Sequence, residues 1–183
     1  MPTPLGPEER AALSALARTS IADALLGDGS LERALREFRP TPGLTEARAS
    51  FVTLRSPDGG LRGCIGGLEP LRPLYLDVVE HARAAAFSDP RFPPVSADEF
   101  PSLDLHVTAL TVPRPVAGPE EIVLGRHGVV FRKGPYRSVF LPQVAPEQGW
   151  NVLTLLEELA RKAGLSRGDW RGAELAVFEG EEF

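Results

Sequence analysis

Apolar and polar positions along this chain follow two different periods. Between residues 8 and 26 apolar side chains recur every three or four positions, which predicts an amphipathic helix. The same spacing predicts helices over 73–88 and 152–163, with Asn151 as the N-cap of the second. A shorter apolar pattern over 31–38 predicts either a short helix or a loop with helix-like spacing.

Other segments alternate polar and apolar residues, which is typical of strands. In the clearest of these, residues 103–112, Leu105 and Val107 face one way and His106 faces the other. Alternation predicts further strands over 47–56, 61–67, 127–133, 136–141 and 173–179. Since most of them come as hairpins and do not alternate regularly with helices, the sequence predicts an α+β protein. We expect a mainly antiparallel β-sheet flanked by helices.

The chain's single cysteine lies in the motif Leu-Arg-Gly-Cys-Ile-Gly-Gly, residues 61–67. A proline and two glycines at 57–60 predict a tight turn, so the motif is the expected return strand of a hairpin. In an extended segment Arg62, Cys64 and Gly66 share one face, and a nearby cation favours the reactive thiolate. The alternative is that Cys64 is a small, buried apolar residue.

Two further segments carry polar groups in loops. Asp89 and Arg91 stand in a proline-rich loop, which is either an ordinary turn after a helix or a pocket wall with an anion-binding arginine. His127 lies in a glycine-flanked turn that opens a strand, a typical place for a binding residue. We predict that five side chains approach a common cleft: those of Arg62, Cys64, Asp89, Arg91 and His127.

Composition limits the classes of function. The formal net charge of -5 over 183 residues argues against a dedicated nucleic-acid binder. One cysteine excludes an internal disulfide, which is typical of the cytoplasm, and no apolar run reaches the roughly 18 residues of a membrane span. The three histidines are widely separated, so we expect no metal site, and no cofactor motif is present.

The motif Leu-Arg-Gly-Cys-Ile-Gly at 61–66 resembles the signature of the AMMECR-type domain family, also called AmmeMemoRadiSam system protein A. Four further segments match in the family's order: 89–94, 125–128, 141–150 and 161–165. The resemblance covers about residues 10–180. It implies an α+β fold with a larger antiparallel-sheet subdomain and a smaller one. We therefore expect residues 1–183 to form a single AMMECR-type domain, with the subdomains tightly packed and residues 1–7 as a disordered tail.

The resemblance implies partners without naming a reaction: bacterial and archaeal relatives are grouped with a Memo-like protein and a radical SAM protein. Two functions remain open. In the first, the chain is a cytoplasmic ligand-binding or catalytic component, with Cys64 as nucleophile or redox thiol and Arg62 as its activating cation. The ligand-binding residues would then be Gly63, Gly66, Asp89, Arg91 and His127. In the second, it is a non-catalytic protein-interaction module in which Cys64 is structural.

Overall fold

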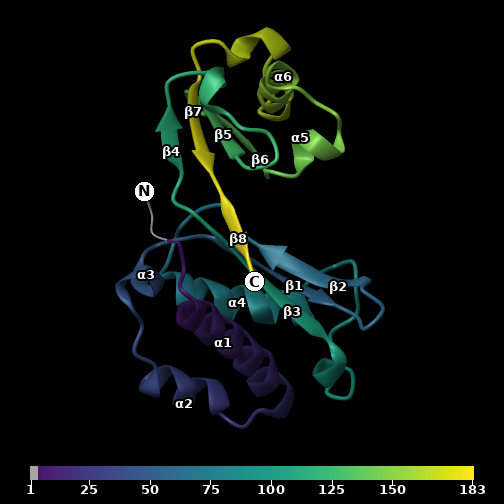
Figure 1. Ribbon diagram of the computed structural model, residues 1–183. Coiled ribbons are helices and arrows are strands. Elements are labelled where there is room, and N and C mark those ends of the chain that lie inside the picture. Colours follow the sequence, from purple (N-terminus) through teal and green to yellow (C-terminus); the bar gives the residue numbers. More distant parts are fainter. Residues whose placement is uncertain (1–3) are drawn as a thin grey trace. The chain divides into compact units, whose positions relative to one another are not determined.

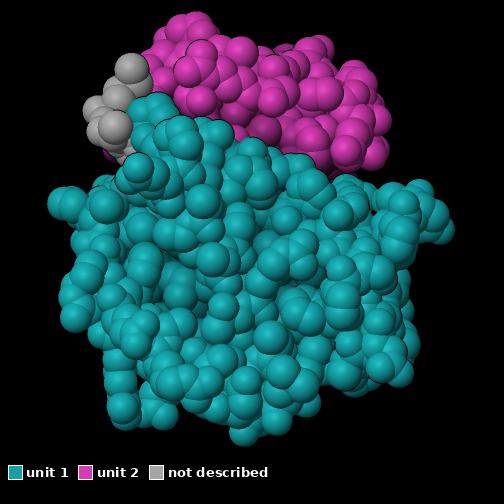
Figure 2. Space-filling model, turned by 60° about the horizontal axis from the view of Figure 1, so that its bottom comes forward, with its two compact units in different colours: residues 1–110, 181–183 teal, residues 111–180 magenta. Residues whose placement is uncertain are grey.

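A computed structural model describes residues 4–183 (Figure 1). The chain divides into two compact units, coloured separately in Figure 2. The first unit comprises the residues up to Leu110 together with the C-terminal residues Glu181–Phe183. The second unit is Thr111–Gly180. Each unit contains one four-stranded sheet, and the strand pairs given for both sheets are antiparallel. The predicted α+β class with antiparallel sheets is confirmed.

The sheet of the first unit has the strand order β2-β1-β3-β8. Its strands are β1 (Ser50–Arg55), β2 (Leu61–Gly66), β3 (Asp104–Leu110) and β8 (Gly180–Glu182). The β1–β2 hairpin that the turn residues predict is confirmed, and Gly59 supplies the positive φ of 85° in its turn. Because β2 pairs only with β1, the cysteine motif forms an edge strand.

Helices cover one face of this sheet. Those that pack on its strands are α1 (Pro7–Leu26) and α4 (Leu74–Phe87). α2 (Ser30–Glu37) packs on α1 and α3 (Pro42–Thr45) on α4, so the ambiguous segment near residue 31 is a helix. Val52 and Val107 point from the sheet into a core that Ile21 and Val78 fill from α1 and α4. The opposite face, turned away from α1 and α4, is called the outer face below.

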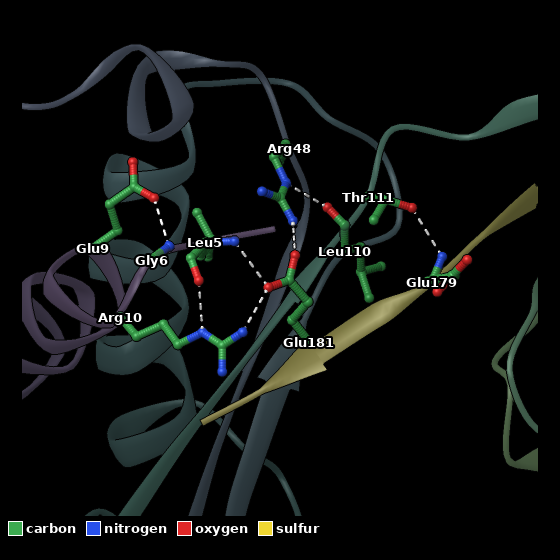
Figure 3. Close-up of polar contacts among 9 residues, drawn as sticks. All are labelled: Leu5, Gly6, Glu9, Arg10, Arg48, Leu110, Thr111, Glu179 and Glu181. Carbon is green, nitrogen blue, oxygen red and sulfur yellow. Dashed lines mark hydrogen bonds and ion pairs between the residues drawn. The ribbon is translucent and has the colours of Figure 1, made fainter. Parts of the chain in front are cut away.

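A buried arginine joins the two ends of the first unit (Figure 3). The Arg48 side chain is 1% exposed, its Nε donates to Leu110 O at 2.8 Å, and its Nη2 lies 3.4 Å from Glu181 Oε1. Glu181 Oε2 accepts from the Leu5 backbone N–H at 3.0 Å and from Arg10 Nη2 at 3.2 Å.

These contacts correct the prediction of a disordered tail over residues 1–7. Residues 1–3 lie outside the described part of the chain. Leu5 is buried and hydrogen-bonded to Glu181, and Pro7 begins α1. The tail prediction does not hold from Leu5 onwards, because burial of an apolar side chain and a backbone hydrogen bond fix the segment.

The second unit contains the strands β4 (Arg114–Val116), β5 (Gly128–Lys133), β6 (Tyr136–Phe140) and β7 (Glu174–Phe178), in the order β4-β7-β5-β6. Its helices are α5 (Val144–Glu147) and α6 (Val152–Lys162). Asn151 caps α6 as predicted, since its Oδ1 accepts from Thr154 N at 2.9 Å. Phe131 and Leu156 are central in the core of this unit.

Candidate functional site

Cys64 lies on the outer face of the first sheet, beside Thr53. The two residues are cross-strand partners, and Thr53 Oγ1 lies 3.3 Å from the half-buried Cys64 Sγ, to which it donates. The preceding residue, Gly63, faces α4 instead, where a Cβ would lie 2.2 Å from Ala85 O. Gly63 therefore lets the edge strand approach the helix, and strand alternation places the thiol on the opposite side.

A row of four polar side chains crosses the outer face at this level. Thr53 pairs with Cys64 on one side and with His106 on the other, and His106 Nδ1 lies 3.9 Å from Glu182 Oε1. Adjacent cross-strand side chains are about 5 Å apart, so Cys64 and His106 are separated by about two such steps. The imidazole thus lies on the same face as the thiol but not within hydrogen-bonding distance of it.

An ion pair holds the peptide group of Cys64. The Cys64 N–H donates to Asp89 Oδ2 at 2.8 Å, and Arg91 Nη2 donates to Cys64 O at 3.2 Å. Arg91 also donates from Nη2 to Asp89 Oδ2 at 2.7 Å and from Nε to Asp89 Oδ1 at 2.9 Å. At this position Asp89 and Arg91 satisfy the backbone groups that a neighbouring strand would otherwise bind. We call this arrangement the Asp89–Arg91 clamp.

The clamp is charged at neutral pH. Hydrogen bonds from the Arg91 side chain hold the pKa of the Asp89 carboxyl well below its usual range, and the Cys64 N–H lowers it further, while burial acts in the opposite direction. Bonding to Asp89 raises the pKa of Arg91. The Asp89 side chain is 2% exposed, whereas that of Arg91 is 54% exposed. One member of the clamp is therefore buried and the other reaches solvent.

Arg62 has a different partner from the one that the sequence predicts. Its Nε lies 2.7 Å from Glu99 Oε1, and its side chain is 15% exposed. The guanidinium that contacts the Cys64 peptide is that of Arg91. A role for Arg62 in activating the thiol therefore stays a prediction. Gly66 lies under the ring of Phe51, where a Cβ would come within 2.3 Å of ring atoms.

His127 lies in the second unit and has contacts of its own there. It is 6% exposed, its Nδ1 accepts from Val123 N at 3.1 Å, and its Nε2 lies 3.7 Å from Glu179 Oε1. These contacts close the loop before β5. Cys64, Asp89 and Arg91 are in direct contact with one another, and the common cleft that would include His127 stays a prediction.

A second polar cluster, which the motifs in the sequence did not indicate, lies at the end of the cysteine motif. Asp77 is buried, accepts from Ser50 Oγ at 2.7 Å, and lies 3.0 Å from His81 Nδ1. A Cβ on Gly67 would lie 3.7 Å from His81 Nε2, so the free edge of the imidazole is next to the motif. Ser50 Oγ and Asp77 Oδ2 lie 3.3 Å and 3.0 Å from the same imidazole nitrogen, His81 Nδ1, whereas a nucleophilic triad uses the two different ring nitrogens. The spacing of Asp77 and His81 on a helix is the signal that could have revealed the pair.

Comparison with known proteins identifies the family. A family model described as AMMECR1 matches residues 14–183. The chain belongs to the AMMECR1 family. This confirms the resemblance on which the fold prediction rests.

Archaeal relatives of this AMMECR1-family chain match over most of its length. Protein MK0488 of Methanopyrus kandleri is 40% identical over 186 residues, which cover 96% of this chain and 88% of that protein. Protein PF1979 of Pyrococcus furiosus is 38% identical over 177 residues, covering 90% of this chain and 81% of that one.

A solved structure has a similar fold. The crystal structure of uncharacterized protein PH0010 from Pyrococcus horikoshii aligns with a TM-score of 0.67 at 32% identity, covering 94% of this chain and 89% of that chain. Among residues 4–183, no helix is long and apolar enough to cross a membrane, and no group of three or more metal-ligating side chains occurs.

Proposed function

We propose that this AMMECR1-family protein is a ligand-binding or catalytic component whose site is the outer face around Cys64. The observation that carries the proposal is the Asp89–Arg91 clamp on the Cys64 peptide. Burial of a carboxylate costs free energy, and a cysteine that only fills space in a core needs no such support. Rigid positioning of a reactive group by buried hydrogen bonds is typical of functional sites.

The exposed part of Arg91 indicates the class of ligand. Its Nε and Nη2 are bound to Asp89 and Cys64, whereas its Nη1 makes no hydrogen bond to any residue between 4 and 183. A guanidinium N–H held next to the Cys64 peptide favours a ligand with an anionic or carbonyl oxygen. In this proposal the thiolate of Cys64 is the nucleophile or redox group. Gly63 and Gly66 let α4 and the Phe51 ring pack closely on the strand that carries it.

Intact-protein mass spectrometry after incubation with a metabolite extract tests the proposal. We expect a bound species on the wild type that is absent from Cys64→Ser and reduced in Asp89→Asn. Arg132→Gln is a matched control, because Arg132 is an exposed arginine on β5, in the other unit. A species retained by Cys64→Ser, or none on the wild type, would contradict a thiol-based site.

Family membership also supports the proposal of cytoplasmic partners, namely a Memo-like protein and a radical SAM protein. A test is co-purification of the three proteins from one organism, with Cys64→Ser and Arg91→Gln as variants. Loss of a complex on substitution of Arg91 alone would place the partner on the outer face. A complex that forms equally well with both variants would mean that the partner binds at another surface of the protein.

A second candidate function is a protein-interaction module in which Cys64 is structural. The observation that favours it is the position of β2 at the edge of its sheet, since an edge strand can pair with a segment of another chain. The clamp occupies the edge only at Cys64. Interaction through β2 would survive Cys64→Ala and would be lost when a proline replaces Arg62, whose N–H faces the free edge as that of Cys64 does.

A further inference from the structure

A hollow of about 940 Å³ lies between α1, α2 and α4 of the first unit. None of its lining residues belongs to the cysteine motif or to the Asp89–Arg91 clamp. Its volume is within the range of pockets that hold small organic ligands, about 300–1,000 Å³. The hollow is therefore a separate candidate site, and an inference about it goes beyond the function proposed above.

The floor of the hollow is apolar. Leu31 and Val79 form part of it and are buried, and Leu76 and Phe87 are half-buried beside them. The small side chains of Ala24 and Ala84 leave the space above this floor open. Apolar surface that stays in contact with water favours a ligand with an apolar body.

The rim of the hollow has an excess of positive charge. Of its three charged residues, Arg72 forms ion pairs with Glu80 and, at 3.8 Å, with the buried Asp77, so its charge is compensated. The third, Arg83, is exposed and forms no ion pair or side-chain hydrogen bond with any residue in the described part of the chain. A single unpaired guanidinium beside an apolar floor matches one anionic group on an apolar chain.

We propose that this hollow binds a small amphipathic carboxylate, with its hydrocarbon chain on Leu31, Val79 and Phe87 and its carboxylate on Arg83. An apolar cation would be repelled by the free arginine, and a neutral apolar molecule would gain nothing from it. A multiply charged phosphate would find only one uncompensated cation. The charge pattern therefore selects a monoanion.

Titration with decanoate and with decan-1-ol, each below its aggregation concentration, tests the site. Binding is followed by NMR shifts and calorimetry. We expect decanoate to bind the wild type about tenfold or more tightly than the alcohol, as for one charge-assisted hydrogen bond. The largest shifts should be at Ala24, Ala84 and Phe87.

Two variants and a control separate the parts of the proposal. Arg83→Gln should bind the two probes with equal affinity, and Ala84→Phe should weaken both because the new ring fills the hollow. Arg132→Gln, which removes an exposed arginine of the second unit, should behave as the wild type. Equal affinity of the wild type for both probes, or shifts centred on other residues, would overturn the proposal. Since none of these positions is in the clamp, failure here leaves the function proposed for Cys64 unaffected.

Discussion

Replacement of Gly63 by alanine tests how the cysteine motif packs on α4. The added Cβ would lie 2.2 Å from Ala85 O and 3.2 Å from Ala85 C, and both are backbone atoms that no side-chain rotation can move away. Ordinary van der Waals contacts of a Cβ are 3.4–4 Å, so β2 and α4 would have to separate by about 1 Å or more. Overpacking of this kind costs about 1–3 kcal/mol. We expect Gly63→Ala at the upper end of that range.

Gly67→Ala is the matched control within the same motif. There the nearest atom to a new Cβ is His81 Cε1 at 3.5 Å, which is an ordinary contact. A compatible glycine-to-alanine change stabilises a protein by about 0.4–1 kcal/mol, because it reduces the conformational entropy of the unfolded chain. The two alanine variants should therefore differ in free energy of unfolding by about 2–4 kcal/mol, the sum of these two effects.

Urea denaturation followed by far-ultraviolet circular dichroism measures this difference. Tryptophan fluorescence is unsuitable, because Trp150 and Trp170 are the chain's only tryptophans and both lie in the second unit. In a thermal melt of the same variants, each kcal/mol of difference in free energy of unfolding should correspond to a shift of about 2–4 °C in Tm for a chain of this size. Equal stability of Gly63→Ala and Gly67→Ala would refute the close approach of β2 to α4.

Three further predictions follow from the charged contacts. Asp89→Asn should be less stable than the wild type at pH 7. Because the pKa of Asp89 is lowered in the folded state, this difference in urea midpoint should narrow as the pH falls below about 4, where the unfolded wild-type chain takes up a proton at Asp89 that the folded protein does not. Arg48→Met should lower the free energy of unfolding by about 3 kcal/mol if the buried pair is broken, and an unchanged midpoint would argue against its burial. Arg91→Gln should slow alkylation of the native thiol more than Arg62→Gln does, since only Arg91 contacts the cysteine peptide.

Local patterns in the sequence predict the hairpin around the motif, and long-range packing decides what surrounds it. Alternation predicts that Arg62 and Cys64 share a face, but a period of two fits either Thr53 or Val52 opposite the thiol. The structure places Thr53 there. The register depends on Gly63 packing against α4, which no local pattern contains.

The candidate site could be predicted only in part, because long-range packing also decides which of its side chains meet. Asp89 and Arg91 were predicted from an acid and a cation in a stiff loop, and they contact Cys64 because α4 returns the chain to the edge of β2. The partner of Arg62 could not be predicted, since Glu99 is 37 positions further along the chain. The burial of Arg48 could not be predicted from the sequence, because an arginine in a strand-like segment is typically exposed.

Iodoacetamide labelling of Cys64 in the native protein tests whether the thiol of the proposed site is accessible and reactive. We expect the thiol on the outer face to be alkylated in the folded protein, without unfolding. Tryptic mass spectrometry measures the fraction of the Cys64 peptide that is modified at each time, with protein in urea as the reference. Modification in urea but none in the native protein would contradict the account and leave Cys64 as a structural residue of an interaction module.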